Sequence, residues 1–302
     1  MTRTFIPITI VLFFIPFPSF AADVAAIKSM DIIPYGEAVK GFKSAVKAEV
    51  SEYTLDAEGD SGIIIKIKNK KTELVFTLGT SALNLVKDEP KDTPVIFTFV
   101  LNPDAVIGRG RGRTNITGID MHIPPEEQFR IFLHVMPKAK RVGVVYDPAK
   151  NQGTIDAAKN AAQNLGITLI AKAVTSGKEA INAISDMEGK IDVLWMVPDT
   201  TVITKESIEY MLLFSFRNRI PLIGISDKYV KSGALFAVSF DNEDMGRQAG
   251  EIAMRVLEGE DIKSMSMLKP RRLRLSINLN TAEKIGLNIP EDIIRRADYV
   301  YK

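Results

Sequence analysis

Arg141-Val-Gly-Val-Val-Tyr146 is a short β-branched apolar run in the middle of the chain, and Asp147-Pro148 follows it at the start of a helical pattern. Such a run, bounded by turn residues, is typical of a strand that is buried on both faces. An earlier series of similar runs covers residues 24–100, and a polar, glycine-rich stretch at 108–118 separates the two series. The pattern predicts an α/β fold of two lobes, each a doubly wound parallel sheet.

The predicted strands and helices alternate along almost the whole chain. Strands are expected at 24–29, 52–55, 74–78, 95–100, 141–146, 168–174, 193–197, 222–225 and 235–239. Helices are expected at 36–46, 81–86, 126–135, 154–165, 178–187, 205–217 and 244–257, several with apolar residues at 3–4 spacing.

The first 21 residues have the features of an export signal. Arg3 forms a short positive region, residues 5–17 are apolar, and Ser19-Phe20-Ala21 places small residues at the cleavage positions. The apolar stretch is short and contains three prolines, so we expect cleavage near Ala22, with an uncleaved anchor as the alternative. The chain has no cysteine, which excludes both disulfides and a lipidated cysteine. We therefore expect a soluble protein in a Gram-negative periplasm.

Charge and length exclude other classes. The 302 residues contain 39 basic and 37 acidic side chains, so no bulk positive field is available for binding nucleic acid. The stretch Arg109-Gly-Arg111-Gly-Arg113 is a solvated loop or a loop that contacts an anion or a partner, and the sequence does not decide between these. It does not match a dinucleotide-binding loop, because Arg113 replaces the third glycine.

The sequence gives no support for catalysis, metal binding or a cofactor. Only two histidines occur, His122 and His134, and no GxSxG elbow accompanies them. Asp56, Glu58 and Asp60 imitate the start of a calcium loop, but Ser61 replaces the required glycine, so a solvated turn is expected. We expect no enzyme activity.

Polar residues that follow the predicted strands are the candidate ligand-binding residues, because open parallel sheets bind ligands at the carboxyl ends of their strands. Thr80 and Ser81 offer hydroxyls to a carboxylate, and Asp199 suits a ligand ammonium, although each is also a plausible helix cap. Tyr35 and Tyr146 offer rings for stacking. The full candidate set is Ser29, Asp31, Tyr35, Gly79, Thr80, Ser81, Asn102, Tyr146, Asn151, Gln152, Asp199, Thr200, Ser226 and Asp227.

Several ordered stretches carry a family resemblance. They include Leu78-Gly-Thr-Ser-Ala82, Asn115-Ile-Thr-Gly118, Val142-Gly-Val-Val-Tyr-Asp-Pro148, Asp192-Val-Leu-Trp-Met-Val-Pro-Asp199 and Leu275-Ser-Ile-Asn-Leu-Asn-Thr-Ala-Glu-Lys-Ile-Gly286. With them the chain resembles the ABC transporter substrate-binding proteins that include tryptophan- and tyrosine-type binders.

The resemblance implies a type I periplasmic binding fold, a Venus-flytrap of two lobes joined by a hinge. It implies crossings near 118–122, 239–244 and 274–278. Lobe 1 would hold residues 22–118 plus about 242–274, and lobe 2 residues 119–241 plus about 275–302. It also assigns Gly79, Thr80 and Ser81 to the loop that approaches the ligand and Asp199 to the position that suits an α-ammonium.

The expected function is delivery of a small polar ligand, an amino acid or a related compound, to an ABC permease in the inner membrane. The expected protein is a monomer that binds no nucleic acid. The alternative is a periplasmic sensing subunit that reports the same kind of ligand to a membrane histidine kinase or chemoreceptor. A DNA-binding repressor of this architecture is disfavoured by the export signal and by the lack of a helix-turn-helix segment.

Overall fold

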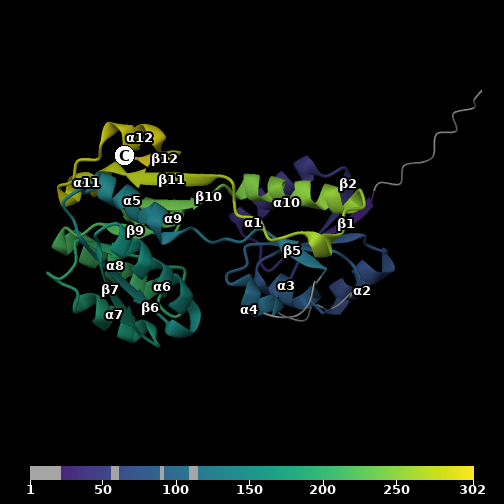
Figure 1. Cartoon of the computed structure of the whole chain (residues 1–302), viewed down its shortest axis with the longest axis horizontal. Coiled ribbons are helices and arrows are strands. Elements are labelled where there is room, and N and C mark those ends of the chain that lie inside the picture. Colours follow the sequence, from purple (N-terminus) through teal and green to yellow (C-terminus); the bar gives the residue numbers. More distant parts are fainter. Residues whose placement is uncertain (1–21, 56–60, 89–91, 109–114) are drawn as a thin grey trace, which may run out of the picture.

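The computed structural model describes residues 22–55, 61–88, 92–108 and 115–302, arranged as two bodies that lie side by side and are joined by crossing segments (Figure 1). The expected export signal, the acidic turn that begins at Asp56 and the arginine-rich loop at 109–113 lie outside the described residues. Within the described part of the chain, no helix combines the length and the apolar character needed to cross a membrane.

The first sheet has the strand order β2-β1-β3-β4-β5, and all of its pairs are parallel. The strands are β1 (Ala22–Lys28), β2 (Ala48–Thr54), β3 (Leu74–Leu78), β4 (Val95–Thr98) and β5 (Ile116–Gly118). The helices between them are α1 (Ile33–Ala45), α2 (Ser61–Asn69), α3 (Thr80–Val86) and α4 (Pro103–Ile107). One face packs on α1 and α10 (Asn242–Leu257), and the other on α2 and α3.

The second sheet has the order β12-β11-β10-β9-β8-β6-β7 and is parallel except for the pair β10–β11. Its strands are β6 (Arg141–Tyr146), β7 (Thr168–Ala173), β8 (Val193–Trp195), β9 (Leu222–Gly224), β10 (Phe236–Phe240), β11 (Leu273–Asn278) and β12 (Tyr299–Tyr301). One face is covered by α5 (Pro125–Val135), α6 (Pro148–Asn164), α11 (Leu279–Ile285) and α12 (Glu291–Arg296), and the other by α7 (Gly177–Ser185), α8 (Lys205–Asn218) and α9 (Asp227–Ser232).

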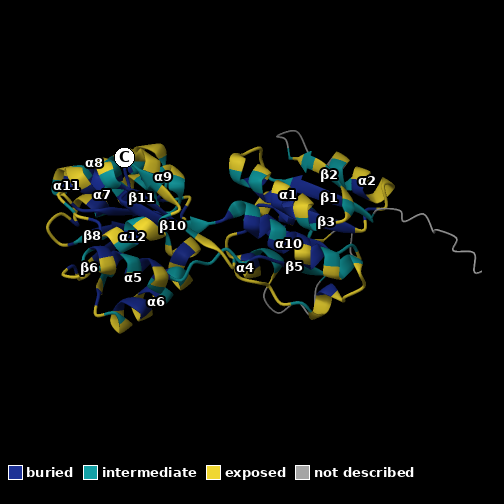
Figure 2. Cartoon of the chain, turned by 90° about the horizontal axis from the view of Figure 1, so that it is seen from above, coloured by how far each residue is buried: buried dark blue, intermediate teal, exposed yellow. Residues whose placement is uncertain are grey.

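Each sheet is therefore buried between two layers of helices, and Figure 2 shows the buried strands inside both bodies with exposed residues on the outer helix faces. This arrangement confirms the predicted fold class, two doubly wound lobes. Parallel strands buried on both faces form continuous apolar runs, and this explains why runs such as Leu74–Leu78 were visible in the sequence.

The chain passes between the sheets at three places: after β5, between β10 and α10, and between the short helix η1 (Ile262–Ser264) and β11. The third crossing lies earlier than the expected 274–278, because these residues already belong to β11 and pair with β10. The expected glycine-rich separator at 108–118 also needs correction, since Ile116–Gly118 forms β5 at the edge of the first sheet.

Helix α10 returns to the first sheet and packs against α1 through glycines. A Cβ on Gly246 would lie 2.7 Å from the Cα of Ala38, and closer still to the Ala38 carbonyl. A Cβ on Gly41 would meet the Glu243 carbonyl, and one on Gly250 would lie 2.8 Å from the Ala45 Cβ. The missing side chains let the two helix backbones touch, so α1 and α10 form one rigid layer.

Candidate functional site

The strand order of each sheet reverses at one place. In the first sheet, β2 is added on one side of β1 and β3 on the other. In the second sheet, β7 and β8 lie on opposite sides of β6 in the same way. The carboxyl ends of strands at such a reversal form the usual ligand crevice of open α/β sheets. Strands β5 and β10 both end where the chain crosses between the lobes. The carboxyl edges of both sheets therefore face the joint, by which we mean the region of the three crossings. The candidate site is built from the loops at these two edges.

The loop after β3 approaches the loop after β1 very closely. Gly79 has φ +94°, and a Cβ there would lie 2.6 Å from the Ser29 Oγ and would collide with the Tyr35 hydroxyl. The Ser29 Oγ accepts a hydrogen bond from the Ala82 N–H at 2.9 Å, so a residue of the neighbouring loop caps α3. Only glycine fits at this position.

Thr80 and Ser81 are exposed, and their hydroxyls make no hydrogen bond within the described residues. The expected alternative, in which one of them caps α3, is not what the structure shows: Gly79 is the N-cap, and the capping oxygen comes from Ser29. Two free hydroxyls therefore lie at the carboxyl edge of the first sheet, beside the strand reversal.

An aromatic pair borders this loop. Tyr35 is buried in the first turn of α1, and its ring centroid lies 4.9 Å from that of Phe99. Burial raises the pKa of the Tyr35 phenol, which therefore stays neutral. Phe99 has φ +59° and Asn102 has φ +52°, left-handed values that cost free energy in residues other than glycine and that cluster at functional loops.

Phe99 was not among the predicted site residues. The run 95–100 was expected to be strand throughout, whereas β4 ends at Thr98 and the chain turns at Phe99. An apolar residue directly after a buried strand looks like its continuation, so the sequence carried no signal for this role.

Large apolar side chains are exposed at the same edge of the first sheet. Ile33 is 79% exposed and Met30 51%, and both follow β1. Ile32 beside them and Leu101 after β4 are also exposed. Apolar surface grouped at the carboxyl edge of a sheet could pack against an apolar part of a ligand or against the opposite lobe.

In the second lobe, Asp199 connects the loops at the strand reversal and is only 3% exposed. Its Oδ2 accepts hydrogen bonds from the Asp147 N–H at 2.7 Å and the Asn151 Nδ2 at 2.9 Å. Its Oδ1 accepts from the N–H groups of Thr201 at 2.9 Å and Val202 at 3.2 Å. These four bonds use the acceptor capacity of the carboxylate, so in this arrangement Asp199 organises the loops.

A second network of polar side chains lies on the exposed side of Asp199. The Asp147 side chain caps α6 by accepting from the Ala149 N–H at 2.9 Å, and it accepts from the Thr201 hydroxyl at 2.7 Å. The Thr201 hydroxyl, followed by the Ala149 N–H, lowers the pKa of Asp147. The Lys150 ammonium donates to the hydroxyls of Thr200 and Thr201, both at 2.6 Å.

The remaining second-lobe candidates near α6 lie next to this network. The buried Asn151 also donates from Nδ2 to the Pro198 carbonyl at 3.0 Å. The Tyr146 hydroxyl lies 3.3 Å from the Gln152 Oε1, and Gln152 in turn donates to Asp156. Tyr146 is buried and Gln152 is exposed, so of the two Gln152 is the one open to solvent.

Ser226 and Asp227 follow β9, one strand away from the reversal. Asp227 Oδ1 accepts from the Ser276 hydroxyl at 3.0 Å and from the Tyr301 hydroxyl at 2.5 Å. Burial, together with this bond, raises the pKa of Tyr301 to about 12. Asp227 thus fastens α9 to β11 and β12.

The other two first-lobe candidates are exposed at the loop tips. Asp31 forms an ion pair with Lys28 at 3.3 Å, with 83% of its side chain exposed. Asn102 begins α4 without a hydrogen bond from its side chain to the helix. The structure therefore brings Ser29, Tyr35, Gly79, Thr80 and Ser81 together in one lobe and Asn151, Asp199 and Thr200 in the other.

A family model described as ABC transporter substrate binding protein matches residues 29–301 of the chain. A tyrosine-binding protein of Clostridioides difficile is 26% identical over 255 residues, which cover 82% of this chain and 73% of that protein.

Solved structures show the same fold. The ligand-free, open structure of a substrate-binding protein with adhesive properties from Clostridium difficile matches with a TM-score of 0.78 at 23% identity. An ABC domain from Streptococcus pneumoniae in complex with L-Trp matches with a TM-score of 0.72 at 21% identity. Each match covers 93% of this chain and 99% of the other.

Proposed function

The chain belongs to the family of ABC transporter substrate-binding proteins, and from this premise we propose that it binds a small polar ligand between the carboxyl edges of its two sheets. An amino acid or a related compound is the proposed ligand class. The observation that carries the proposal is that both strand reversals face the same joint, with free hydroxyls on one side and an ordered polar loop on the other. The relatives named for tyrosine and L-Trp support the ligand class.

On the first lobe, the Thr80 and Ser81 hydroxyls are proposed to hydrogen-bond the ligand carboxylate. Both are exposed and bonded to no other described residue, so binding would not require an existing bond to break. The pair Tyr35–Phe99 and the exposed Met30 offer apolar contact to the ligand side chain. This division, polar contacts beside an apolar wall, is common in small-molecule sites.

On the second lobe, Asp199 remains the proposed partner of a ligand ammonium, with Asn151 and Thr200 beside it. Its four existing bonds mean that an ammonium would have to replace at least one donor, such as the Asn151 amide. A ligand that bridges both lobes has higher affinity for a closed arrangement and therefore stabilises it.

We further propose that the protein acts without catalysis, as a monomer in the periplasm, and passes its ligand to an inner-membrane permease. We take lobe 1 as residues 22–118 plus about 242–271, and lobe 2 as the rest of the chain after the signal. The second part of lobe 1 is shorter than the expected 242–274, because Leu273 already pairs with Phe240 in the second sheet. A sensing subunit would use the same site but a different membrane partner. Neighbouring genes for a permease and an ATPase would favour transport, and a histidine kinase gene would favour sensing.

The test is a thermal-shift screen of protein beginning at Ala22 against amino acids, peptides, nucleosides and sugars. A specific ligand at 100 times its Kd should stabilise the folded state by about 2.7 kcal/mol. Thr80→Ala combined with Ser81→Ala should weaken that ligand at least about tenfold, because bonds to a charged group are lost.

Asn84→Ala is the matched control, since Asn84 is exposed on the same helix but lies outside the proposed contact loop. It should leave affinity unchanged, and all variants should unfold at the same temperature without ligand. A screen in which no amino acid or related compound stabilises the protein would refute the ligand class. Unchanged affinity in the double variant would refute the role of the first-lobe hydroxyls.

A further inference from the structure

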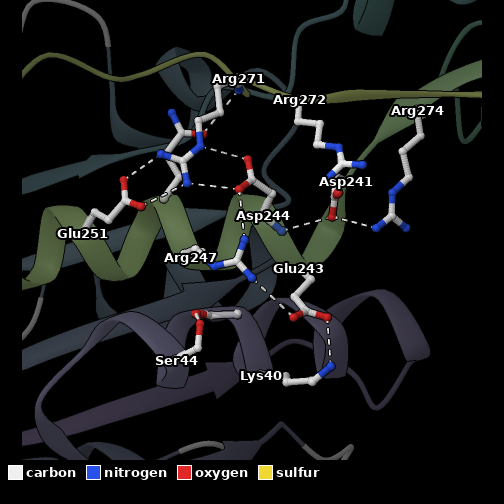
Figure 3. A network of polar contacts seen from close by, with 12 residues as sticks. Lys40, Ser44, Asp241, Glu243, Asp244, Arg247, Glu251, Arg271, Arg272 and Arg274 are labelled. Atoms are coloured by element: carbon white, nitrogen blue, oxygen red, sulfur yellow. Dashed lines mark hydrogen bonds and ion pairs between the residues drawn. The ribbon is translucent and has the colours of Figure 1, made fainter. Parts of the chain in front are cut away.

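The joint between the lobes contains a group of opposite charges that the ligand site does not use. Figure 3 shows the carboxylates of Asp241, Asp244 and Glu251, at the start of α10 and along it, beside three arginines at the end of the third crossing and the start of β11. The arginines are Arg271, Arg272 and Arg274. Three cations within four residues repel one another unless carboxylates neutralise them.

Arg271 fastens the crossing segment to the first lobe. It donates from Nε and Nη2 to the two oxygens of Asp244, each at 3.0 Å, and from Nη1 and Nη2 to Glu251 at 2.8 and 2.9 Å. The Arg271 bond lowers the pKa of Asp244. Gln248 also donates to the Lys269 carbonyl at 2.9 Å, so the segment up to Arg271 is held on α10.

The same segment is attached to the first crossing. Leu268 forms a parallel bridge with Ile119, accepts from the Asp120 N–H at 2.8 Å and donates to the Gly118 carbonyl at 2.9 Å. Beyond Arg271 the chain enters the second lobe, because Leu273 pairs with Phe240 in the β10–β11 ladder. The change of lobe on the third crossing is therefore limited to the residues around Arg272.

Asp241 lies beside Arg272, on the second crossing between β10 and α10, and 4% of its side chain is exposed. Its Oδ1 accepts from the Asp244 N–H at 3.1 Å and caps α10. The same oxygen lies 2.8 Å from Arg274 Nη2, and Oδ2 lies 3.3 Å from Arg272 Nε. One nearly buried carboxylate thus connects a helix of the first lobe to the strand β11 of the second.

The arginine partners of Asp241 are held on their other side by the second lobe. The Arg274 Nη1 donates to the Tyr299 hydroxyl at 2.9 Å, and Arg272 Nη2 lies 3.8 Å from Asp298. Because α10 and α1 touch through glycine, a rotation of α10 at Asp241 also moves α1 and Tyr35 in its first turn. The joint is thus mechanically connected to the proposed ligand site.

We infer that Asp241 is a hinge residue of the joint, and that its ion pairs with Arg272 and Arg274 set the equilibrium between the open and closed arrangements of the two lobes. This equilibrium exists in the ligand-free protein and does not depend on which ligand the site binds.

The test measures the distance between the lobes. The chain has no cysteine, so Asn84→Cys on α3 and Asn160→Cys on α6 provide two unique labelling positions, both exposed. Spin labels on these cysteines report the distribution of lobe separations in the ligand-free protein. Asp241→Asn keeps an N-cap side chain but removes the charge. We expect this variant to change the population ratio of the open and closed arrangements about tenfold, which is within the usual range of conformational coupling.

Arg274→Gln should change the distribution in the same way, and it serves as a second variant if Asp241→Asn folds poorly. Arg255→Gln is the matched control, because Arg255 pairs with Glu260 within the first lobe. It should leave the distribution unchanged. Unchanged distributions in Asp241→Asn and Arg274→Gln, or an equal change in Arg255→Gln, would overturn the inference.

Discussion

Replacing Gly246 by alanine should separate α10 from α1 and destabilise the first lobe. The new methyl group would lie 2.7 Å from the Ala38 Cα and nearer to the Ala38 carbonyl, whereas Cβ contacts under 3.0 Å essentially never occur. Both obstacles are backbone atoms, which cannot turn aside as a side chain can. The helices must therefore move apart by about 1 Å, and close contacts at Gly41 and Gly250 loosen with them.

The expected size follows from two opposing effects. Forcing an extra methyl group into a packed interface costs about 3 kcal/mol at the upper end of measured cases. Alanine recovers about 1 kcal/mol of intrinsic helix propensity over glycine. We therefore expect Gly246→Ala to lower the free energy of unfolding by about 2 kcal/mol.

Gly36→Ala is the matched control, because Gly36 lies in α1 and a Cβ there meets nothing within 4 Å. This variant should gain up to about 1 kcal/mol. Denaturant unfolding followed by circular dichroism reports both lobes, whereas fluorescence of the single tryptophan, Trp195, reports the core of the second lobe. The reasoning is refuted if Gly246→Ala is as stable as Gly36→Ala.

Two further predictions concern the second lobe. Asp199→Ala removes four hydrogen bonds from a buried loop junction, so it should lower the free energy of unfolding by about 2–4 kcal/mol even without ligand. A loss below about 0.5 kcal/mol in denaturant unfolding would contradict the role of Asp199 in organising the loops. Tyr301→Phe tests the pH dependence of stability. The folded-state pKa of Tyr301 is about 12, above its ordinary value of 10.0. The contribution of the phenol to the free energy of unfolding is therefore fully present below pH 10 and is lost as the pH rises toward 12. The stability difference between the natural protein and Tyr301→Phe should therefore narrow between pH 10 and pH 12, and a constant difference in denaturant unfolding would contradict the prediction.

The sequence predicted the buried strands best. The expected strands 74–78 and 141–146 coincide with β3 and β6, because both are nearly continuous apolar runs buried on both faces. Strand β5 was missed because it has three residues and ends in glycine. Strand β11 was taken for a crossing because Arg274 and Ser276 interrupt its apolar pattern and because it runs antiparallel at the end of a parallel series.

Strand-end reasoning predicted that the candidate residues follow the strands, as they do in the structure, but it did not reveal their hydrogen bonds. The Ser29 cap on α3 depends on β1 lying beside β3, which no local pattern encodes. The saturation of Asp199 likewise depends on donors from the loop after β6. Residue type and spacing indicate where a polar side chain lies, whereas its partners are set by tertiary contacts.

The contact between α1 and α10 also determines the order in which the molecule becomes complete during synthesis. Residues 22–118 are made before the second lobe, but the sheet face that contains Phe76 is covered by α1 alone until Met245, Ala249 and Ile252 of α10 have followed. About 140 residues separate the end of β5 from the end of α10, which corresponds to roughly 10–30 s of translation. Throughout that interval one helix layer of the nascent first lobe is incomplete, so the first lobe becomes complete only after strands β6 to β10 of the second lobe have been made.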